Sequence, residues 1–322
     1  SETITVSRFN GMRKLGSLEL AITDWRAQTL STWATDGDIA RLAIPDDKDL
    51  DWVHSVCDPS DDFNTPLKGP FTPIFGGSAD ISRTALAICK TAHLIPSAVM
   101  VNITDQDIVG LDFVDLEQIL SLILNPSNQL MEVSAANVPL QVAEASRVHV
   151  FRPQDGGEEH YAIEIGNPDR KKSVLSRLHS ACFTGDLIGS LKCDCGHQLK
   201  AALEAISLDG SGILLYMNQE GRGIGLANKM RAYALQNQGF DTVEANHRLG
   251  FEDDERNFKI GAEILRLMGF ESVRLMTNNP EKVASMEAVG ITVSERVPLQ
   301  VGSNPLNEKY LKTKAKKSGH IL

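Results

Sequence analysis

Short apolar runs alternate with helical patterns in the second half of the chain, and this alternation constrains the fold more than any other feature. RVHVF (147–151) and YAIEIG (161–166) have the pattern of strands. GILLY (212–216) is an apolar run that begins at a glycine, and SVRLM (272–276) ends in the turn TNNP. Apolar residues at helical spacing lie between the strands, at residues 199–206. Alternating strands and helices are typical of layered folds, so we predict an α/β (α+β) architecture.

Glycines mark the predicted ends of two further helices. The stretch LANKMRAYALQNQ is followed by Gly239, and a helical pattern from about Arg256 to Met268 is followed by Gly269. A glycine just past the last helical residue is a common terminator, because it adopts the left-handed conformation without strain.

The chain has 322 residues, which is enough for two domains. Apolar residues at helical spacing predict a helix over 113–123, and SAVMVNI (97–103) predicts a buried strand. The clearest boundary falls near 135–147, where AANVPLQVAEASR follows an amphipathic stretch. We therefore predict an N-terminal domain over 1–140 and a second domain over 141–322.

Composition excludes several classes of protein. The first residues, SETITVSRFNGMRKLG, lack the apolar segment of a signal peptide, and no run of about 18 apolar residues occurs. We expect a cytoplasmic protein that binds no membrane. The formal net charge of -10 disfavours binding to nucleic acid. The five cysteines, mostly clustered, predict free thiols in a reducing compartment.

Three of these cysteines, Cys182, Cys193 and Cys195, lie in the short segment CFTGDLIGSLKCDC. Four protein ligands usually make a structural zinc site, whereas three ligands and a water make a catalytic one. The segment therefore favours metal-assisted hydrolysis. His179 or His197 as a fourth ligand would give a structural zinc protein instead, and chance clustering of buried apolar cysteines is the third alternative.

A glycine-rich loop, YMNQEGRGIGL (216–226), follows a predicted strand and contains Glu220 and Arg222. Exposed backbone N–H groups beside an arginine suit a phosphate or a nucleotide, although such a loop is often only a turn. Further along, Asp254 lies two residues before Arg256. The alternative for these charges is a solvated loop in which Asp254 caps the helix that begins near Arg256.

Together these segments resemble GTP cyclohydrolase II over roughly residues 173–322. The likeness rests on RLHSACFTGD, GSLKCDCGHQL, QEGRGIGLANKMRAYALQNQG, DTVEANHRLGFEDDER, RLMTNNPEKV and the ending NEKYLKTKAKKSGHIL. The resemblance implies a mixed sheet with flanking helices in a homodimeric enzyme. It also implies an enzyme that uses one Zn²⁺ per chain, and Mg²⁺ with the triphosphate, to open a nucleobase ring of a nucleoside triphosphate and release pyrophosphate.

The resemblance also implies roles for individual residues. Cys182, Cys193 and Cys195 would be the zinc ligands, without His179 or His197. Arg256 would attack the α-phosphate, with Asp254 as its base and Tyr233 near the reacting ring. Nucleotide contacts would come from Arg177, Leu178, His179, Ser180, Ala181, Gln198, Glu220, Gly221, Arg222, Thr242, Thr277 and Lys282. Because three thiolates give the zinc site a formal charge of -1, we expect Tyr233, His179 or Glu220 to assist the bound water.

Two departures from the family pattern bear on the substrate. Asn218 stands where members of the riboflavin pathway usually have arginine. The N-terminal region faintly resembles dihydroxybutanone-phosphate synthase, but Ile81 and Arg83 replace the His and Glu of its catalytic turn, so we expect it to be non-catalytic. These departures resemble the uracil-catabolic branch of the superfamily, and they predict hydrolytic opening of the uracil ring of UTP. The alternative is GTP cyclohydrolase II, which releases formate and pyrophosphate from GTP for riboflavin biosynthesis. A regulatory module that binds a nucleotide without turnover is a third possibility.

The N-terminal domain also contains Trp25, Trp33 and Trp52. Tryptophan side chains bury large apolar areas, so we expect these three in the core.

Overall fold

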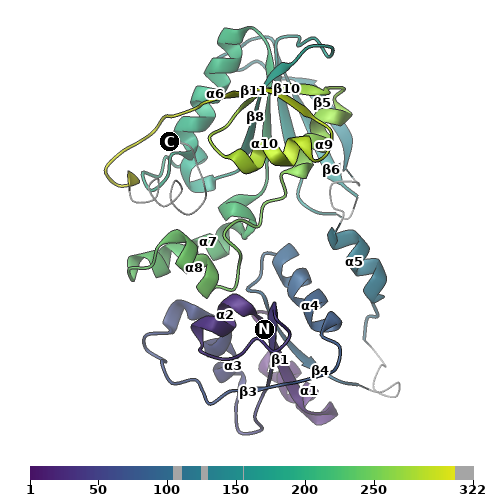
Figure 1. The fold of residues 1–322 in the computed structure, drawn as a ribbon, viewed down its shortest axis with the longest axis vertical. Coiled ribbons are helices and arrows are strands. Elements are labelled where there is room, and N and C mark those ends of the chain that lie inside the picture. The colour runs from purple at the N-terminus through teal and green to yellow at the C-terminus, as the bar shows by residue number, and fades with distance from the viewer. Residues whose placement is uncertain (104–110, 125–129, 155, 309–322) are drawn as a thin grey trace. The chain divides into compact units, whose positions relative to one another are not determined.

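The structure is a computed structural model, and it describes residues 1–103, 111–124, 130–154 and 156–308 (Figure 1). The ending that contributes to the family resemblance, from residue 309 onward, lies outside the described residues.

Internal contacts divide the chain into two compact units. Unit 1 comprises residues 1–124 and 224–255, and unit 2 comprises residues 125–223 and 256–322. The segment 224–255 therefore packs with the N-terminal part of the chain. The predicted boundary at residue 140 separates two continuous stretches of sequence, whereas each compact unit combines two segments. The predicted boundary stays a prediction.

Unit 1 contains a four-stranded antiparallel sheet in the order β3-β2-β1-β4. Alternate residues of β1 enter different cores: Leu20 and Ile22 pack with helices α1 and α3, whereas Ala21 packs with Leu86 of α4. The second segment of the unit adds helices α7 and α8, and α8 packs against α2 (Figure 1). The elements are α1 (Val6–Leu15), β1 (Leu18–Thr23), α2 (Asp24–Thr29), β2 (Ile39–Ala43), α3 (Leu50–Cys57), β3 (Thr72–Pro73), α4 (Asp80–Thr91), β4 (Ser97–Val101), α5 (Leu116–Leu124), α7 (Gly225–Asn237) and α8 (Thr242–Arg248).

Unit 2 contains a seven-stranded mixed sheet in the order β11-β10-β8-β9-β7-β6-β5. The pairs β11–β10, β10–β8 and β8–β9 are parallel, and the remaining pairs are antiparallel. The elements are β5 (Leu130–Asn137), β6 (Ser146–Pro153), β7 (His160–Ile165), β8 (Val174–Ser180), a π-helical turn (Phe183–Leu187), α6 (Cys195–Asp209), β9 (Gly212–Met217), α9 (Lys259–Leu267), β10 (Ser272–Met276), α10 (Pro280–Glu287) and β11 (Thr292–Val297).

Helices cover both faces of this sheet, because successive side chains of its central strands point to opposite sides. In β9, Ile213 and Leu215 pack in the core that includes α9 and α10. Leu214, between them, packs against Ala202 and Ile206 of α6. The α/β prediction with a mixed sheet and flanking helices is confirmed.

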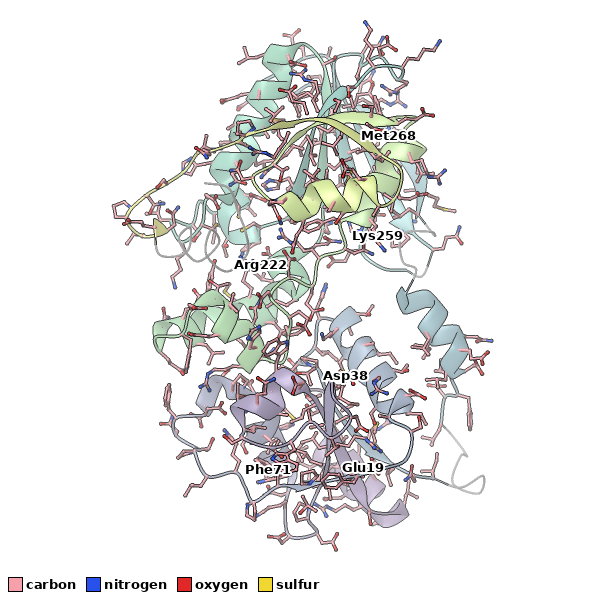
Figure 2. All side chains as sticks on the ribbon, in the orientation of Figure 1. Glu19, Asp38, Phe71, Arg222, Lys259 and Met268 are labelled. Carbon is pink, nitrogen blue, oxygen red and sulfur yellow. The ribbon has the colours of Figure 1, made fainter. Side chains whose placement is uncertain are left out.

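The predicted strands and helices are present, with shifts at their ends. The predicted strand at 272–276 coincides with β10. Helix α9, however, begins at Lys259 and not near Arg256, because Asn257 Oδ1 accepts the Lys259 N–H at 3.0 Å. Figure 2 labels Lys259, the first residue of this helix, and Met268, the residue that follows its last one.

Two further expectations concern exposure. Trp33 is 74% exposed, so the prediction of three core tryptophans is wrong for this residue, whereas Trp25 and Trp52 are partly buried. Strand β4 is only partly buried beyond Ser97. Across the described parts of the chain, no helix combines the length and the apolar character needed to cross a membrane.

Candidate active site

Most of the predicted site residues follow three neighbouring parallel strands. β8 ends at Ser180, β9 at Met217 and β10 at Met276, and β8 lies between the other two. The cysteine loop (181–195), the glycine-rich loop and the TNNP turn each begin at one of these ends. Ligands of open α/β sheets bind beyond the carboxyl ends of the strands. The topology therefore gathers three separate sequence motifs at one edge.

The three cysteines of the predicted metal site converge in this region. Their Sγ atoms all lie within 4.8 Å of one another, and those of Cys182 and Cys193 are 3.8 Å apart. Tetrahedral zinc with Zn–S distances of about 2.3 Å requires sulfurs about 3.8 Å apart. The spacing and the thiolate chemistry therefore fit a zinc ion.

Gly185 makes this convergence possible. A Cβ atom at this position would lie 2.8 Å from Cys193 Sγ and 2.9 Å from Cys195 Cβ. Because both distances are shorter than real Cβ contacts, any other residue would push the cysteines apart. The Gly185 N–H also donates to Cys182 Sγ at 3.3 Å, which fixes the first thiol in the loop.

Asp186 anchors the same loop to the sheet. Its carboxylate accepts the Cys182 N–H and the Tyr216 hydroxyl, each at 3.0 Å, and it contacts His179 Nε2 at 3.0 and 3.1 Å. Burial lowers the pKa of His179 and raises the pKa of Tyr216, so both are neutral donors at pH 7. Asp186 and Tyr216 were not predicted as site residues; the position of Asp186, four residues after Cys182, was the available signal.

The surroundings of the three cysteines show whether a fourth protein side chain could bind the metal. Among the residues that the structure describes, the possible metal ligands at this position are the three cysteines. His179 directs Nε2 to Asp186, and its Nδ1 is buried without a hydrogen-bond partner. The arrangement favours an open metal site over a structural one.

Glu220 connects the cysteine loop to the glycine-rich loop. One carboxylate oxygen accepts the Phe183 N–H at 2.6 Å, and the other accepts the Gly221 N–H at 2.8 Å. Two residues after Glu220, Arg222 has a φ of +64°, which is in the left-handed region. This conformation costs a residue with a Cβ about 1–2 kcal/mol, and such strain tends to persist at functional sites.

Cationic side chains gather near the end of β8. Arg256 Nη1 donates to Ser180 Oγ at 3.2 Å, and its Cζ lies 4.8 Å from the Phe258 ring centroid. Lys282 Nζ lies 5.2 Å from the same ring and donates to the Leu178 carbonyl at 2.8 Å. Both cations therefore lie close to the ring of Phe258.

Arg177 is a third cation, and it is 6% exposed. Its Nη1 donates to the Met276 carbonyl at 2.9 Å, and its Nη2 donates to Gln198 Oε1. Its Nε is buried without a hydrogen-bond partner. Burial lowers the pKa of Arg177 to about 10, so the side chain is still charged at pH 7. A buried charge of this kind suits an anionic ligand.

Some predicted nucleotide contacts have local roles in the fold. Thr277 Oγ1 accepts the Asn279 N–H at 3.0 Å, within the TNNP turn. The Leu178 side chain is fully buried in the core, so only its backbone faces the site. The Ala181 N–H donates to the Met217 carbonyl at 2.8 Å, which joins the ends of β8 and β9.

Tyr233, Thr242 and Asp254 belong to unit 1. Tyr233 lies on α7, with its ring 5.8 Å from Lys229 Nζ. Thr242 begins α8, and its hydroxyl accepts from Gln236 Nε2 at 3.4 Å. Their roles toward the substrate stay predictions.

Asn218 forms hydrogen bonds with residues at the start of the neighbouring strand β7. Its side-chain amide donates to the Glu159 carbonyl at 2.6 Å, and its backbone N–H donates to His160 Nδ1 at 3.1 Å. Burial lowers the pKa of His160 to about 4, so this ring is a neutral acceptor. The side chain at position 218 therefore binds its own sheet.

Comparison with known proteins identifies the family. The family model of GTP cyclohydrolase II matches residues 131–298. A GTP cyclohydrolase-2 from Azospirillum brasilense is 44% identical over 313 residues, which cover 94% of this chain and 81% of that protein. The chain belongs to the GTP cyclohydrolase II family. It is a hydrolase that acts on a nucleoside triphosphate.

Two other relatives carry the same name as the Azospirillum protein. A GTP cyclohydrolase-2 from Azotobacter vinelandii is 57% identical over 175 residues, covering 54% of this chain and 84% of that protein. One from Salmonella typhimurium is 53% identical over 194 residues, covering 60% of this chain and 98% of that protein. A solved two-domain 3,4-dihydroxy-2-butanone 4-phosphate synthase from A. baumannii aligns over 92% of this chain and 89% of its own, at 15% identity and a TM-score of 0.33.

The prediction that UTP is the substrate is wrong. It rested on Asn218 and on the N-terminal region, and the relatives named GTP cyclohydrolase-2 contradict it. The Azospirillum relative aligns over 94% of this chain, so an N-terminal region of this kind occurs in a protein of that name. The Asn218 side chain binds the Glu159 carbonyl. The identity of the residue at position 218 therefore does not indicate which base the enzyme binds.

Proposed function

We propose that this member of the GTP cyclohydrolase II family opens the imidazole ring of GTP and releases formate and pyrophosphate. The observation that carries the proposal is the group of three cysteine sulfurs beyond the carboxyl ends of the parallel strands. The choice of GTP is supported by relatives that bear this name at up to 57% identity. As the family resemblance implies, we expect a homodimer in the cytoplasm.

Cys182, Cys193 and Cys195 would hold one Zn²⁺ per chain. Zinc, when bound there, supplies a Lewis acid and an acidified water for hydrolysis of the ring. Because three thiolates weaken that acidification, a nearby group has to assist proton transfer. Tyr233 is the residue that we propose for this task from the family resemblance, because His179 is held by Asp186 and Glu220 accepts two backbone N–H groups.

The cations at the strand ends would bind the triphosphate together with Mg²⁺. Arg177 contributes a buried charge, and Lys282 a second one beside Phe258. The glycine-rich loop would add backbone donors beside these cations, as is common in phosphate sites. These groups hold the triphosphate while the ring reacts.

Arg256 would act at the α-phosphate. A guanidinium is protonated at pH 7, so its nitrogen attacks only as a carboxylate takes the proton, and Asp254 is the residue proposed for this. A bond forms between Arg256 and the α-phosphorus as the bond to the leaving pyrophosphate breaks. The contact between Arg256 and Ser180 Oγ would orient the guanidinium.

The test is to incubate the zinc-loaded full chain with Mg²⁺ and either GTP or UTP. Formate, pyrophosphate and the ultraviolet band of the base are followed together. We expect equal amounts of formate and pyrophosphate from GTP, and no change in the UTP band. GTP that binds without releasing either product would instead identify a regulatory nucleotide-binding module.

A further inference from the structure

The acidic loop, residues 252–255, carries four carboxylates in succession and leads directly into Arg256. Like charges at such spacing repel one another, so a loop of this composition needs partners to hold one conformation. The structure supplies several partners within unit 1, and two of them come from the N-terminal region, residues 1–124.

Trp25 of α2 holds the first carboxylate of the loop. Its indole Nε1 donates to Glu252 Oε2 at 2.8 Å. Its ring also stacks on His247, with centroids 3.6 Å apart and planes inclined by 7°. His247 Nε2 in turn contacts Asp253 Oδ1 at 2.6 Å. One tryptophan therefore contacts the first carboxylate directly and the second through His247.

Lys90 of α4 holds the last carboxylate. Its Nζ donates to Glu255 Oε1 at 2.6 Å, and both side chains are partly buried. The same oxygen accepts the Glu252 N–H at 2.9 Å, which closes the loop on itself. Because this ion pair is partly shielded from solvent, it is stronger than a fully exposed one.

The end of α8 lies close against the N-terminal region. A Cβ atom at Gly250, whose φ is +88°, would lie 2.7 Å from Thr23 Oγ1 and 3.1 Å from Pro96 Cγ. The backbone just before the acidic loop therefore rests against β1 and the start of β4. Gly250 thus adds a third contact with the N-terminal region to those of Trp25 and Lys90.

From these contacts we propose that Trp25 and Lys90 are positioning residues for the cyclohydrolase reaction. They fix Glu252 and Glu255 and thereby set the position of Asp254, which lies between them, and of the adjoining Arg256. The inference rests on the proposed roles of Asp254 and Arg256. It assigns a task in catalysis to an N-terminal region that was expected to be only a non-catalytic scaffold.

The test compares variants of the full chain by two measurements. Hydrogen–deuterium exchange of peptides covering 250–257 reports the order of the loop without substrate. Steady-state kinetics with GTP report kcat and KM separately. Lys90→Met removes the charge, Lys90→Arg keeps it, and Trp25→Phe keeps the stacking ring but removes the indole N–H. Arg83→Met is the matched control, because Arg83 lies on the same helix α4 and pairs with Asp38 and Asp80.

We expect Lys90→Met and Trp25→Phe to speed exchange in 250–257 and to lower kcat by about 10- to 100-fold, with KM for GTP nearly unchanged. A displacement of about 1 Å in a catalytic group has an effect of this size. Lys90→Arg and Arg83→Met should behave like the wild type. The exchanged pair Lys90→Glu with Glu255→Lys should recover the part of the loss that comes from the ion pair, but not the part that comes from the Glu252 N–H, because a lysine side chain cannot accept it. A general defect in folding would give no recovery.

Two outcomes would overturn the inference. One is unchanged exchange in 250–257 for Lys90→Met and Trp25→Phe. The other is faster exchange with an unchanged kcat. Failure of the proposed function shows separately, as a wild-type chain that releases no formate from GTP, and the exchange measurement then still decides whether these residues order the loop.

Discussion

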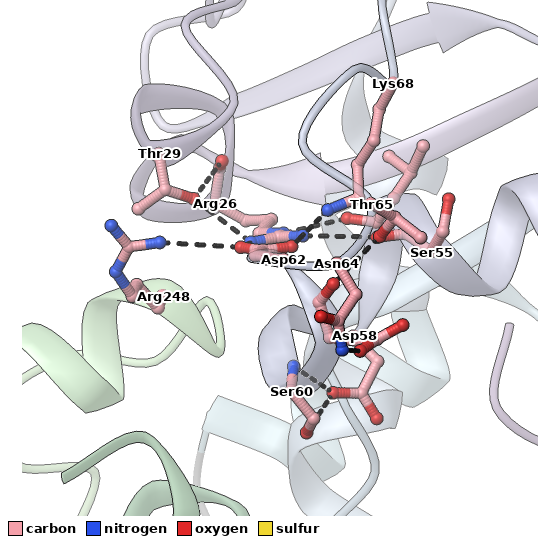
Figure 3. A network of polar contacts seen from close by, with 12 residues as sticks. Arg26, Thr29, Ser55, Asp58, Ser60, Asp62, Asn64, Thr65, Lys68 and Arg248 are labelled. Atoms are coloured by element: carbon pink, nitrogen blue, oxygen red, sulfur yellow. Dashed lines mark hydrogen bonds and ion pairs between the residues drawn. The ribbon is translucent and has the colours of Figure 1, made fainter. Parts of the chain in front are cut away.

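Two buried arginines, one in each unit, differ in their hydrogen-bond partners. Arg26 of α2 is 2% exposed, and its Nη1 and Nη2 donate to Asp62 at 2.7 and 2.9 Å. Lys68 and Arg248 contact the same carboxylate (Figure 3). Arg177 of β8 is 6% exposed, and it donates to a carbonyl and to an amide oxygen; burial lowers its pKa, and the attraction of the Asp194 carboxylate raises it in part.

Arg26 has a structural role in this contrast, and Arg177 is the arginine for which we propose a role in ligand binding. A buried guanidinium that has no carboxylate as hydrogen-bond partner is less well compensated than one in an ion pair, and an anionic ligand can complete its pairing. Arg26 has its counter-charge within the protein, in the Asp62 carboxylate. Arg177 keeps its charge at the edge of the sheet where the cysteine loop and the glycine-rich loop meet.

The largest effect should come from the cysteines of the strand-end region. Cys193→Ser removes one of three thiolates, so zinc content and formate release should fall together to background. Cys89→Ser, in unit 1, is the control and should keep both. Metal analysis and a formate assay on the same samples measure this. A Cys193→Ser protein with one zinc per chain and full turnover would contradict the assignment of the site.

Arg256→Ala should separate the two half-reactions. Without the attacking guanidinium, pyrophosphate release should stop, whereas removal of zinc should stop formate release and spare pyrophosphate at least in part. Arg256→Lys should also fail, because an ammonium group lacks the planar fork. A pyrophosphate assay decides, and normal release by Arg256→Ala would remove this residue from the mechanism.

The buried arginines themselves should respond in opposite ways. Asp62→Asn leaves Arg26 and Lys68 without their counter-charge and should lower the free energy of unfolding by about 3–5 kcal/mol. Arg177→Met should leave that free energy within about 1 kcal/mol but lower kcat/KM for GTP roughly 10²-fold. Denaturant unfolding and kinetics on both variants test the pair. An equal loss of the free energy of unfolding in the two variants would contradict the proposed difference between Arg26 and Arg177.

A smaller effect involves pH and the buried base His160. Its folded-state pKa of about 4 lies below the usual 6.5, so the unfolded chain takes up a proton first as the pH falls. Stability is therefore full above pH 6.5 and should decline by about 3 kcal/mol down to pH 4. His160→Gln keeps a hydrogen-bond acceptor for the Asn218 N–H and should flatten this slope. An unchanged slope in unfolding curves between pH 6.5 and 4 would contradict the assignment.

Much of the fold could be predicted because local pattern and tertiary structure agree in unit 2. Apolar runs such as 212–216 and 272–276 became central parallel strands, and parallel strands buried on both faces show strong apolar runs. The start of α9 could not be placed, because it depends on the hydrogen bond from Lys259 N–H to Asn257 Oδ1.

The site was predictable where function and spacing coincide in one segment, as for the cysteines. Asp186 and Tyr216 were missed because their importance depends on a contact between β9 and the cysteine loop. The base specificity was mispredicted because the replacement of the family's arginine by Asn218 was interpreted as a change of substrate, whereas the Asn218 side chain binds Glu159. The packing of 224–255 with the N-terminal region depends on contacts distant in sequence, which no local pattern reveals.

X-ray absorption at the zinc edge of the loaded full chain would show whether Cys182, Cys193 and Cys195 hold an open zinc site. We predict three sulfur neighbours at about 2.3 Å and one oxygen neighbour, without the outer-shell signal of an imidazole. Three sulfurs with an imidazole nitrogen, or four sulfurs, would close the coordination sphere and contradict a catalytic zinc at Cys182, Cys193 and Cys195.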